Sequence, residues 1–283
     1  MIIVADSGST KADWLIFDDG KVQGPFATMG FNPLFHDSDR VFAELSEHNE
    51  LKSFQQKEGE IHFFGAGCSS ASMNAVIESG LKRFFQNTTV HVHHDLLASA
   101  LATCGNEPGI ACILGTGSNS CWFDGKNVHE RNYGLGYVLG DEGSGSYFGK
   151  KLLTLFLYGR MPGELSKDFE SRYGLNKDLI IDHVYKQAHA NVWLASFTRF
   201  LTSHAEHEWI RELVRKGLDD FAELFICDYQ LYREVPVHFV GSLSFLFREQ
   251  LNEVAAIRGF QIGKVIKQPI EELMDYFIHT ENS

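Results

Sequence analysis

Short apolar runs and amphipathic stretches alternate along the first hundred residues of the chain. The apolar runs have the length of buried strands, whereas the longer stretches repeat apolar side chains at three- and four-residue spacing, as helices do. The pattern predicts strands at 2–5, 13–17, 61–64 and 89–93, and helices at 38–47, 71–85 and 95–102. Strands that alternate with helices indicate an α/β sheet, with functional groups at the carboxyl ends of the strands.

The strand, loop and strand at the start of the chain occur a second time. Residues 2–20 read as an apolar strand, a loop of glycine and hydroxyl residues, a returning strand and an Asp-Gly turn, and residues 113–125 read the same way. In this comparison Gly8 aligns with Gly117, and the two Asp-Gly turns align with each other. A repeat of about a hundred residues indicates a duplicated domain, because the units of solenoids are roughly 20–50 residues long.

The duplication predicts two lobes, and a length of 283 residues exceeds what one hydrophobic core usually serves. We expect the first lobe to span residues 1–106 and the second to span residues 107–283. A long helical stretch at about 146–233 reads as an insert in the second lobe. The pattern after the insert predicts strands at 236–240 and 260–266. A closing helix is predicted from Pro269, because proline favours the first position of a helix.

Three turns rich in glycine and hydroxyl residues follow predicted strands, at 7–10, 115–119 and 241–243. Glycine removes side-chain bulk, so that backbone N–H groups and hydroxyls can face an anion such as a phosphate. A single turn of this kind is more often an ordinary hairpin. Three at equivalent places of a duplicated frame indicate a nucleotide site. If the lobes face each other, the first two turns hold the phosphates and the third, at a helix N-terminus, lies beside the nucleoside.

Four charged residues near these turns are candidates for the chemistry. Asp6 ends the first strand and suits a water-mediated contact with Mg²⁺, which takes few protein carboxylates; the alternative is that it bonds the amides of its own turn. Lys11 either reaches a phosphate or lies in solvent. Asp95 is placed either to cap the following helix or to act as a base toward an acceptor hydroxyl. Asp141 lies in a glycine-rich loop that either approaches a ligand or caps the helix from Ser144.

Charge and composition exclude several classes of protein. A formal net charge of −12 argues against nucleic acid or an acidic membrane surface as the main partner, and no apolar run reaches the roughly 20 residues of a membrane helix. The N-terminus reads as a strand and not as a signal peptide. We therefore expect a cytoplasmic protein with reduced cysteines. The histidines at 91–94 lack partners at zinc spacing, and the cysteines lack iron–sulfur spacing. The oligomeric state stays open, a homodimer included.

Four motifs together resemble one known family. They occur in the family's order and span nearly the whole chain: Asp6-Ser-Gly-Ser-Thr-Lys11, Leu114-Gly-Thr-Gly-Ser-Asn119, Gly136-Tyr-Val-Leu-Gly-Asp-Glu-Gly-Ser-Gly145 and Val240-Gly-Ser242. The family is the N-acetylglucosamine kinase-like branch of the BadF/BadG/BcrA/BcrD ATPases, within the sugar kinase/actin/heat-shock ATPase superfamily. The resemblance implies an α/β fold of two duplicated ribonuclease H-like (actin-like ATPase) lobes, with ATP, Mg²⁺ and an amino sugar in the interlobe cleft.

The resemblance also implies roles for individual residues. The residues implied to hold ATP are Gly8, Ser9, Thr10, Lys11, Thr116 and Gly117 at the phosphates, and Gly241 and Ser242 at the nucleoside. Asp6 matches the acid linked to Mg²⁺, and Asp95 matches the base that takes the proton of the acceptor hydroxyl. The residues implied to contact the sugar are Asn32, Asp95, Ser118, Asn119, Leu135, Gly136 and Asp141.

The activity implied is ATP-dependent phosphorylation of an amino sugar, N-acetylglucosamine or a relative such as N-acetylmuramic acid. Leu135 departs from the family, which often carries tryptophan at this place, and the departure bears on how the sugar or its N-acyl group is packed. Two other functions stay open. One is an ATP-driven activator of an acyl-CoA dehydratase or reductase, which holds an iron–sulfur cluster with cysteines at a dimer interface. The other is a protein that binds a sugar or nucleotide without phosphorylating it; intact Asp6 and Asp95 argue against that reading.

Overall fold

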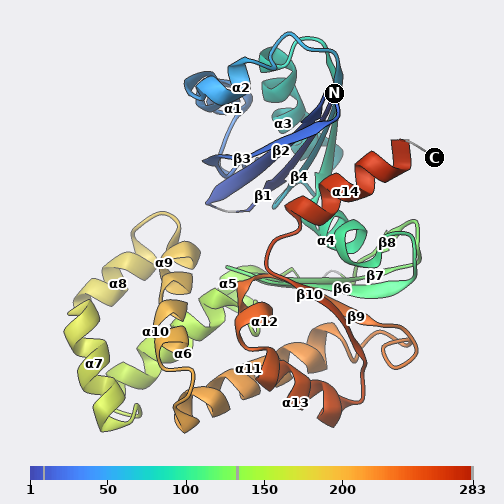
Figure 1. Ribbon diagram of the computed structural model, residues 1–283. Helices are drawn as coiled ribbons and strands as arrows, with labels where there is room; N and C mark the ends of the chain where they lie inside the picture. Colours follow the sequence, from blue (N-terminus) through green and yellow to red (C-terminus); the bar gives the residue numbers. More distant parts are fainter. Residues whose placement is uncertain (9, 132–133, 282–283) are drawn as a thin grey trace. The chain divides into compact units, whose positions relative to one another are not determined.

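The chain divides into two compact units, which Figure 1 shows in a computed structural model that describes residues 1–8, 10–131 and 134–281. The first unit consists of Met1–Glu107 together with Gln268–Ser283, and the second consists of Pro108–Lys267. Each unit contains its own five-stranded sheet. Two sheets with a helical segment in the second unit confirm the predicted α/β fold with two duplicated lobes.

The sheet of the first unit has the strand order β3-β2-β1-β4-β5. Its strands are β1 (Ile2–Ser7), β2 (Lys11–Asp18), β3 (Lys21–Met29), β4 (Gly59–Gly65) and β5 (Thr88–His94). The first three strands form an antiparallel meander, and β1, β4 and β5 run parallel. The carboxyl ends of β1, β4 and β5 therefore lie at one edge, which is the edge where the sequence predicts the chemistry.

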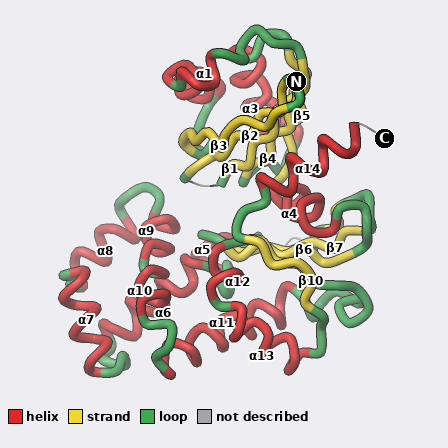
Figure 2. The backbone as a smooth tube through the Cα atoms, in the orientation of Figure 1, coloured by secondary structure: helices red, strands yellow, loops and turns green. Residues whose placement is uncertain are grey.

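Helices cover both faces of this sheet (Figure 2). They are α1 (Ser38–Glu47), α2 (Asn49–Lys52), α3 (Ala71–Phe84), α4 (Asp95–Cys104) and α14 (Ile270–Glu281). Because successive strand side chains point to opposite faces, Ile3 and Ala5 join the core with α1 and α3, whereas Asp6 belongs to the opposite face. On that opposite face α14 packs on β1, β2 and α4, and the ring of Phe277 stacks on His62 with centroids 3.8 Å apart.

The sheet of the second unit has the strand order β10-β9-β6-β7-β8. Its strands are β6 (Gly109–Leu114), β7 (Ser118–Phe123), β8 (Val128–His129), β9 (Val237–Val240) and β10 (Ile262–Ile266). Here β6 and β7 are antiparallel while β6, β9 and β10 are parallel. This arrangement repeats the first sheet strand for strand, so the duplication predicted from the glycine loops is present in the topology.

The helices of the second unit lie mostly between β8 and β9. They are α5 (Gly136–Leu139), α6 (Gly145–Leu157), α7 (Gly163–Tyr173), α8 (Lys177–Tyr185), α9 (Ala190–Ser196), α10 (Thr198–Ser203) and α11 (Glu208–Phe225), followed after β9 by α12 (Ser242–Leu246) and α13 (Arg248–Arg258). The run from α6 to α11 matches the predicted helical insert. Its apolar stripes pack into one core with the strands, for example Leu152, Phe169 and Phe221.

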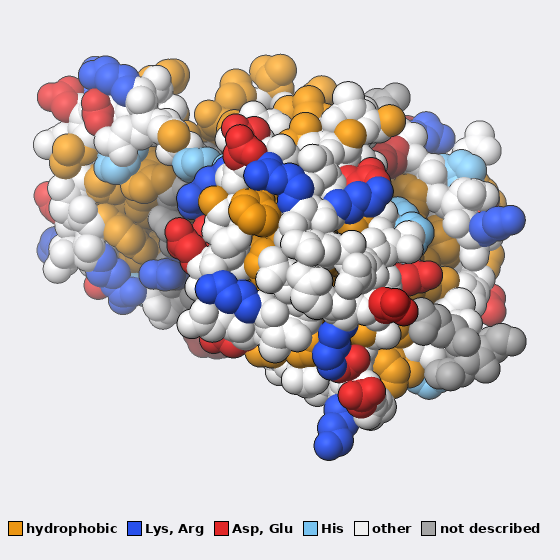
Figure 3. Space-filling view, turned by 90° about the horizontal axis from the view of Figure 1, so that it is seen from above, with side chains coloured by type: hydrophobic (Ala, Val, Ile, Leu, Met, Phe, Trp, Pro, Cys, Tyr) orange, Lys and Arg blue, Asp and Glu red, His pale blue; other side chains and the backbone are white. Residues whose placement is uncertain are grey.

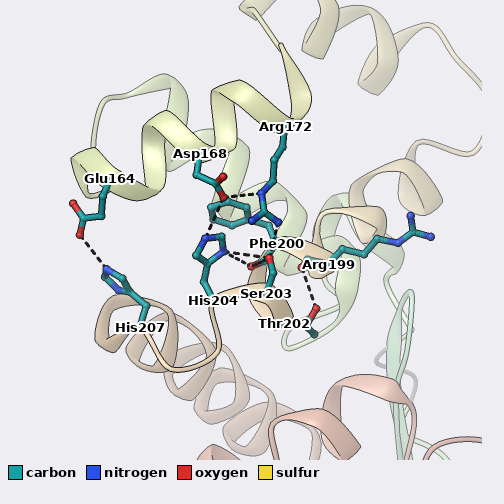
Figure 4. Close-up of polar contacts among 9 residues, drawn as sticks. All are labelled: Glu164, Asp168, Arg172, Arg199, Phe200, Thr202, Ser203, His204 and His207. Carbon is teal, nitrogen blue, oxygen red and sulfur yellow. Dashed lines mark hydrogen bonds and ion pairs between the residues drawn. The ribbon is translucent and has the colours of Figure 1, made fainter.

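Polar contacts tie the outer helices of the insert together, as Figure 4 shows. His204, which follows α10, places its Nε2 3.1 Å from Asp168 Oδ2 on α7. His207, at the start of α11, places its Nε2 3.1 Å from Glu164 Oε1, one turn earlier on α7. None of these residues is among the predicted site residues, so we assign the cluster to the packing of the insert.

Two sequence expectations differ from the structure. The last helix, α14, groups with the first unit and not with residues 107–267, because its apolar side packs on β1, β2 and α4. The alignment of Gly8 with Gly117 is also wrong. Sheet register places Ser7 opposite Ala12 and Leu114 opposite Ser118, so Gly8 corresponds to Gly115, and the first hairpin loop is one residue longer.

Candidate functional site

The first hairpin loop joins β1 to β2 at the carboxyl edge of the first sheet. The N–H of Gly8 donates to the carbonyl of Lys11 over 3.0 Å, which closes the loop. Gly30 packs under it so closely that a Cβ there would lie 2.1 Å from the carbonyl oxygen of Gly8. Gly8 and Thr10 are exposed, and Ser9 lies outside the described residues. The loop therefore presents backbone and a hydroxyl to solvent on a rigid base.

Three carboxylates gather beside this loop. Asp6 of β1 lies opposite Asp13 of β2 in the sheet, and burial together with the charges of Asp95 and Asp13 raises the pKa of Asp6 to about 7. Lys11 offsets part of this charge, because its Nζ lies 2.5 Å from Asp13 Oδ1. The structure does not decide whether Lys11 reaches a phosphate or lies in solvent, because its side chain is half exposed and forms an ion pair with Asp13.

Asp95 is the first residue of α4, directly after β5. The cap of α4 is His94, whose ring nitrogen accepts the N–H of Leu96 over 3.5 Å, so Asp95 does not fill the capping role. Its Oδ1 lies 3.3 Å from His94 Nδ1, and its side chain is 28% exposed. Burial and the charge of Asp95 raise the pKa of Cys68, which follows β4, to about 12. Asp95 therefore lies at the same sheet edge as Asp6, with an accessible carboxylate.

Asn32 is buried in the segment that follows β3. Its Oδ1 accepts the N–H of Leu34 over 2.9 Å, and Gly67 packs against the amide, since a Cβ at Gly67 would lie 2.5 Å from that oxygen. The segment is joined to the first hairpin because the N–H of Phe31 donates to Ser7 Oγ over 2.8 Å. The predicted sugar contact is thus held firmly within the first unit.

The second hairpin loop is fixed from two sides within the second unit. The N–H of Gly115 donates to the carbonyl of Gly117 over 3.0 Å, and the carbonyls of Gly115 and Thr116 accept the N–H groups of Gly145 and Ser146 at the start of α6. The predicted nucleoside turn lies against it. Gly241 has a φ of +133°, and a Cβ there would lie 2.1 Å from the carbonyl oxygen of Leu114.

Two predicted sugar contacts are engaged inside the second unit. Ser118 Oγ donates to the carbonyl of Glu142 over 2.7 Å. Asp141 is buried, with one oxygen 3.5 Å from the N–H of Ser118 and the other accepting Ser146 Oγ over 3.3 Å; burial raises its pKa. Asp141 also has a φ of +61°, a strained value for a residue other than glycine. These bonds fix the turn that carries Asn119.

Leu135 and Gly136 begin the short helix α5, and Leu135 is 60% exposed. Sequence reasoning missed Lys150 of α6, whose ammonium donates to the carbonyl of Tyr137 in this helix. The sequence offers only a weak indication of this role. Of the two consecutive lysines, Lys150 lies on the side of α6 that is partly buried, and Lys151 is exposed. Burial lowers the pKa of Lys150.

In the described part of the chain, no three His, Cys, Asp or Glu residues converge as metal ligands. The rings of His62 and His91 stack 5.1 Å apart. Among the described helices, none is both long and apolar enough for a membrane span. On the face drawn in Figure 3, basic side chains are scattered among acidic ones. Four of the five cysteines are buried.

Comparison with known proteins places the chain in context. No family model and no curated protein sequence matches it. A proposed N-acetylglucosamine kinase from Porphyromonas gingivalis is similar at 36% sequence identity and a TM-score of 0.91, over 99% of this chain and 100% of that one. A proposed N-acetylglucosamine kinase from Chromobacterium violaceum shares the fold at 19% identity and a TM-score of 0.76, over 97% of this chain and 98% of that one. A non-polymerising MamK mutant bound to AMPPNP shares the fold at 11% identity and a TM-score of 0.50, over 100% and 98%.

The full-length match at 36% identity agrees with the duplicated sheets and with the order of the glycine loops. The likeness to the MamK structure is one of fold alone. On this evidence the chain belongs to the N-acetylglucosamine kinase-like family.

Proposed function

We propose that the protein transfers the γ-phosphoryl group of ATP to a hydroxyl of an amino sugar, namely N-acetylglucosamine or a relative such as N-acetylmuramic acid. The observation that carries the proposal is the proximity of Asp6 to Asp95: burial first, and then the charges of Asp95 and Asp13, raise the pKa of Asp6. Like charges held together cost stability. A functional reason for this cost is that Asp6 binds a cation and Asp95 accepts a proton.

Asp95 suits the role of catalytic base in this reaction. Its carboxylate is accessible at the N-terminus of α4 and is not used to cap the helix. It takes the proton of the acceptor hydroxyl as that oxygen forms a bond to the γ-phosphorus and the bond from the γ-phosphorus to ADP breaks. Such transfers need little covalent help from a protein, so positioning and charge stabilisation supply most of the catalysis.

The two hairpin loops suit the phosphates of ATP. Thr10 and Thr116 offer hydroxyls, and Gly8 leaves room for close approach of an anion. The space beside Gly117 is taken by the carboxylate of Asp141. Lys11 shares its charge between Asp13 and an incoming phosphate. Since the candidate ATP residues belong to both units, the proposal requires both to act on one nucleotide.

Asp6 fits a magnesium ion. A carboxylate whose pKa is about 7 because of burial and neighbouring acids gains from a cation that relieves the repulsion. Mg²⁺ is commonly held by one carboxylate, water and phosphates. When bound, the ion neutralises charge on the transferring phosphate.

The experiment is an ADP-release assay with a panel of acceptors: N-acetylglucosamine, N-acetylmuramic acid, glucosamine, glucose and water. We expect release that depends on Mg²⁺ and on an N-acetyl sugar, with a matching sugar phosphate in ³¹P NMR. ADP release that no sugar stimulates contradicts the kinase assignment. Binding of ATP and sugar by calorimetry without any ADP supports instead a binding protein.

The buried cysteines count against the second reading, an activator with a shared iron–sulfur cluster. Cys68, Cys104, Cys112 and Cys121 are all buried, whereas such a cluster needs cysteines at a surface where two subunits meet. Iron and sulfide analysis of protein purified without oxygen tests this reading directly.

A further inference from the structure

Helix α11, the longest helix of the insert, packs against the start of α6, which carries the second hairpin loop. Glycines let the two segments come close. A Cβ on Gly217 of α11 would lie 2.5 Å from the ring of Phe148, and a Cβ on Gly143 would lie 2.9 Å from the Cβ of Phe221. Neither position has room for a methyl group. The turn at 143–148 therefore has little freedom to move relative to α11.

The first polar link between α11 and this turn is a buried hydroxyl. Tyr147 Oη donates to Asp220 Oδ2 over 2.6 Å, and Tyr147 is 7% exposed. Burial first, and then the hydrogen bond to Asp220, raise the pKa of Tyr147, so its hydroxyl keeps the proton and remains a donor at neutral pH. A hydrogen bond to an ionised acceptor is stronger than one between neutral groups. The link therefore fixes the first turn of α6 against α11.

The second polar link reaches the hairpin itself. Ser120 Oγ donates to the carbonyl of Phe225 over 2.6 Å, and Ser120 directly follows Asn119 in β7. Phe225 is the last residue of α11. The last carbonyls of a helix have no partner within it, and here Ser120 supplies one from outside. Helix α11 thus holds the hairpin at β7 as well as through α6.

The link at Tyr147 bears directly on the loop proposed to hold phosphates. Ser146, its neighbour in the chain, donates its N–H to the carbonyl of Thr116 over 3.0 Å, and Gly145 donates to that of Gly115 over 2.8 Å. A shift of the first turn of α6 therefore moves both carbonyls, and with them the hydroxyl of Thr116. No residue of α11 is a candidate ATP contact, so the helix acts on the loop through α6 and β7.

We propose that Tyr147 and Asp220 are positioning residues, and that through them helix α11 sets the second hairpin loop for the phosphates of ATP. The inference rests on the proposed kinase function and goes beyond it, because it assigns the insert a part in nucleotide binding. The longest helix of the insert is a support for the loop, and the Tyr147–Asp220 hydrogen bond joins the two.

The test compares Y147F, D220A, D220N and the double variant Y147F/D220A by steady-state kinetics. Y147F keeps the ring and removes only the hydroxyl. We expect its KM for ATP to rise about three- to tenfold. Its KM for the sugar should stay within about twofold, because Ser118 and Ser120 keep their own hydrogen bonds. D220A should show the same rise in KM for ATP, and the double variant should be no worse than either single variant. D220N should recover part of the affinity, because its amide oxygen still accepts.

The matched control is Y158F. Tyr158 directly follows the last residue of the same helix, α6, and is 75% exposed. Loss of its hydroxyl should leave both KM values unchanged. An unchanged KM for ATP in Y147F, or an equal rise of both KM values, overturns the proposal.

A second readout does not depend on activity. In Y147F, hydrogen exchange followed by NMR should be faster at the amides of Gly145 and Ser146 and unchanged in α7. A merely structural role would loosen the insert as a whole and speed both sets, and that result, or unchanged exchange at 145–146, contradicts the proposal. If Y147F does not fold, D220A and D220N take its place. If the wild type phosphorylates no sugar, the kinase function fails, and hydrogen exchange still decides whether Tyr147 holds the loop.

Discussion

The two hairpins share a backbone design and differ in charge. In the first, Asp6 faces Asp13 across β1 and β2; in the second, the corresponding pair is Ile113 and Asn119. Asp95 adds a third carboxylate to the first hairpin, whereas the carboxylate near the second, Asp141, is turned inward onto Ser118 and Ser146. Duplication kept the loop that suits an anion and concentrated acid chemistry in one copy.

This asymmetry has a physical advantage. Two copies with exposed carboxylates facing one triphosphate would repel it twice. The second hairpin offers hydrogen-bond donors, and the carboxylate beside it, Asp141, is buried. In our proposal the first unit handles the cation and the proton, and the second fixes the donor and acceptor by neutral contacts. Five substitutions, with their controls, test this division.

The largest effect is expected for Asp95→Asn. Amide nitrogen cannot take a proton, so kcat should fall about 10²- to 10⁴-fold, with ATP affinity within about threefold of the wild type by calorimetry. The matched control is Asp275→Asn on the exposed side of α14, which should keep full activity. Sugar phosphorylation near the wild-type rate by a folded Asp95→Asn protein removes the base assignment.

Asp6→Asn should lose activity and gain stability. Folding raises the pKa of Asp6 from 3.8 to about 7, so the folded state binds this proton more tightly, and stability falls as pH rises from about 4 to about 7. Asparagine resembles the protonated form and avoids the loss. Urea unfolding should show little difference at pH 4 and a gain at pH 8 of about 4 kcal/mol at most.

The control for that measurement is Asp19→Asn, at an exposed turn with a φ of +49° that asparagine tolerates. Its stability should follow the wild type at both pH values. A gain for Asp6→Asn that is equal at pH 4 and pH 8 contradicts the electrostatic explanation.

Alanine substitutions of Gly241 and Gly8 should differ in their effect on stability, because the two turns leave different space for a side chain. At Gly241 a Cβ would meet the carbonyl oxygen of Leu114 at 2.1 Å, and the φ of +133° suits glycine, so Gly241→Ala should cost about 3 kcal/mol or more. At Gly8 the nearest atom is 3.7 Å away. Gly8→Ala should keep its melting temperature and bind ATP more weakly, because the added methyl lies where a phosphate would approach. Equal melting temperatures for the two variants contradict this contrast.

The smallest effect is expected for Asn119→Asp, which makes the second hairpin more like the first. The new carboxylate can still accept the N–H of Ser120, as Asn119 Oδ1 does over 2.9 Å, so the fold should be kept. An added charge near the phosphates should weaken ATP binding by about 1 kcal/mol, or roughly fivefold, and the loss should shrink in high salt. Tighter ATP binding shows that the second hairpin does not face phosphates.

Features that depend on local sequence patterns, such as the strands and the duplication, could be predicted. Apolar periodicity located the strands other than β3 (Lys21–Met29) and β8 (Val128–His129), and the repeated Gly-hydroxyl loops revealed the duplication. Contacts between distant parts of the chain were beyond that reasoning. The apolar stripe of α14 does not say which sheet it covers, and the glycine count did not show that the first loop is one residue longer than the second.

The candidate site shows the same limit. Asp6 and Asp95 were identified from their places at strand ends, which is local information. Ser118 and Asp141 form hydrogen bonds within the second unit. These bonds depend on how the loop at 140–146 folds back onto the hairpin, which local sequence does not show. Lys150 was overlooked because its role lies in two backbone carbonyls, which leave no trace in side-chain spacing.

The placement of α14 has a consequence for biosynthesis. The second unit is one continuous segment, Pro108–Lys267, while the first needs residues from both ends of the chain. A ribosome therefore completes the second unit before it supplies Phe277, which stacks on His62 in the first sheet. The first unit is translated first but can complete its fold only when the C-terminal helix has been made. A chain truncated near residue 267 would therefore lack part of the unit that contains Asp6 and Asp95.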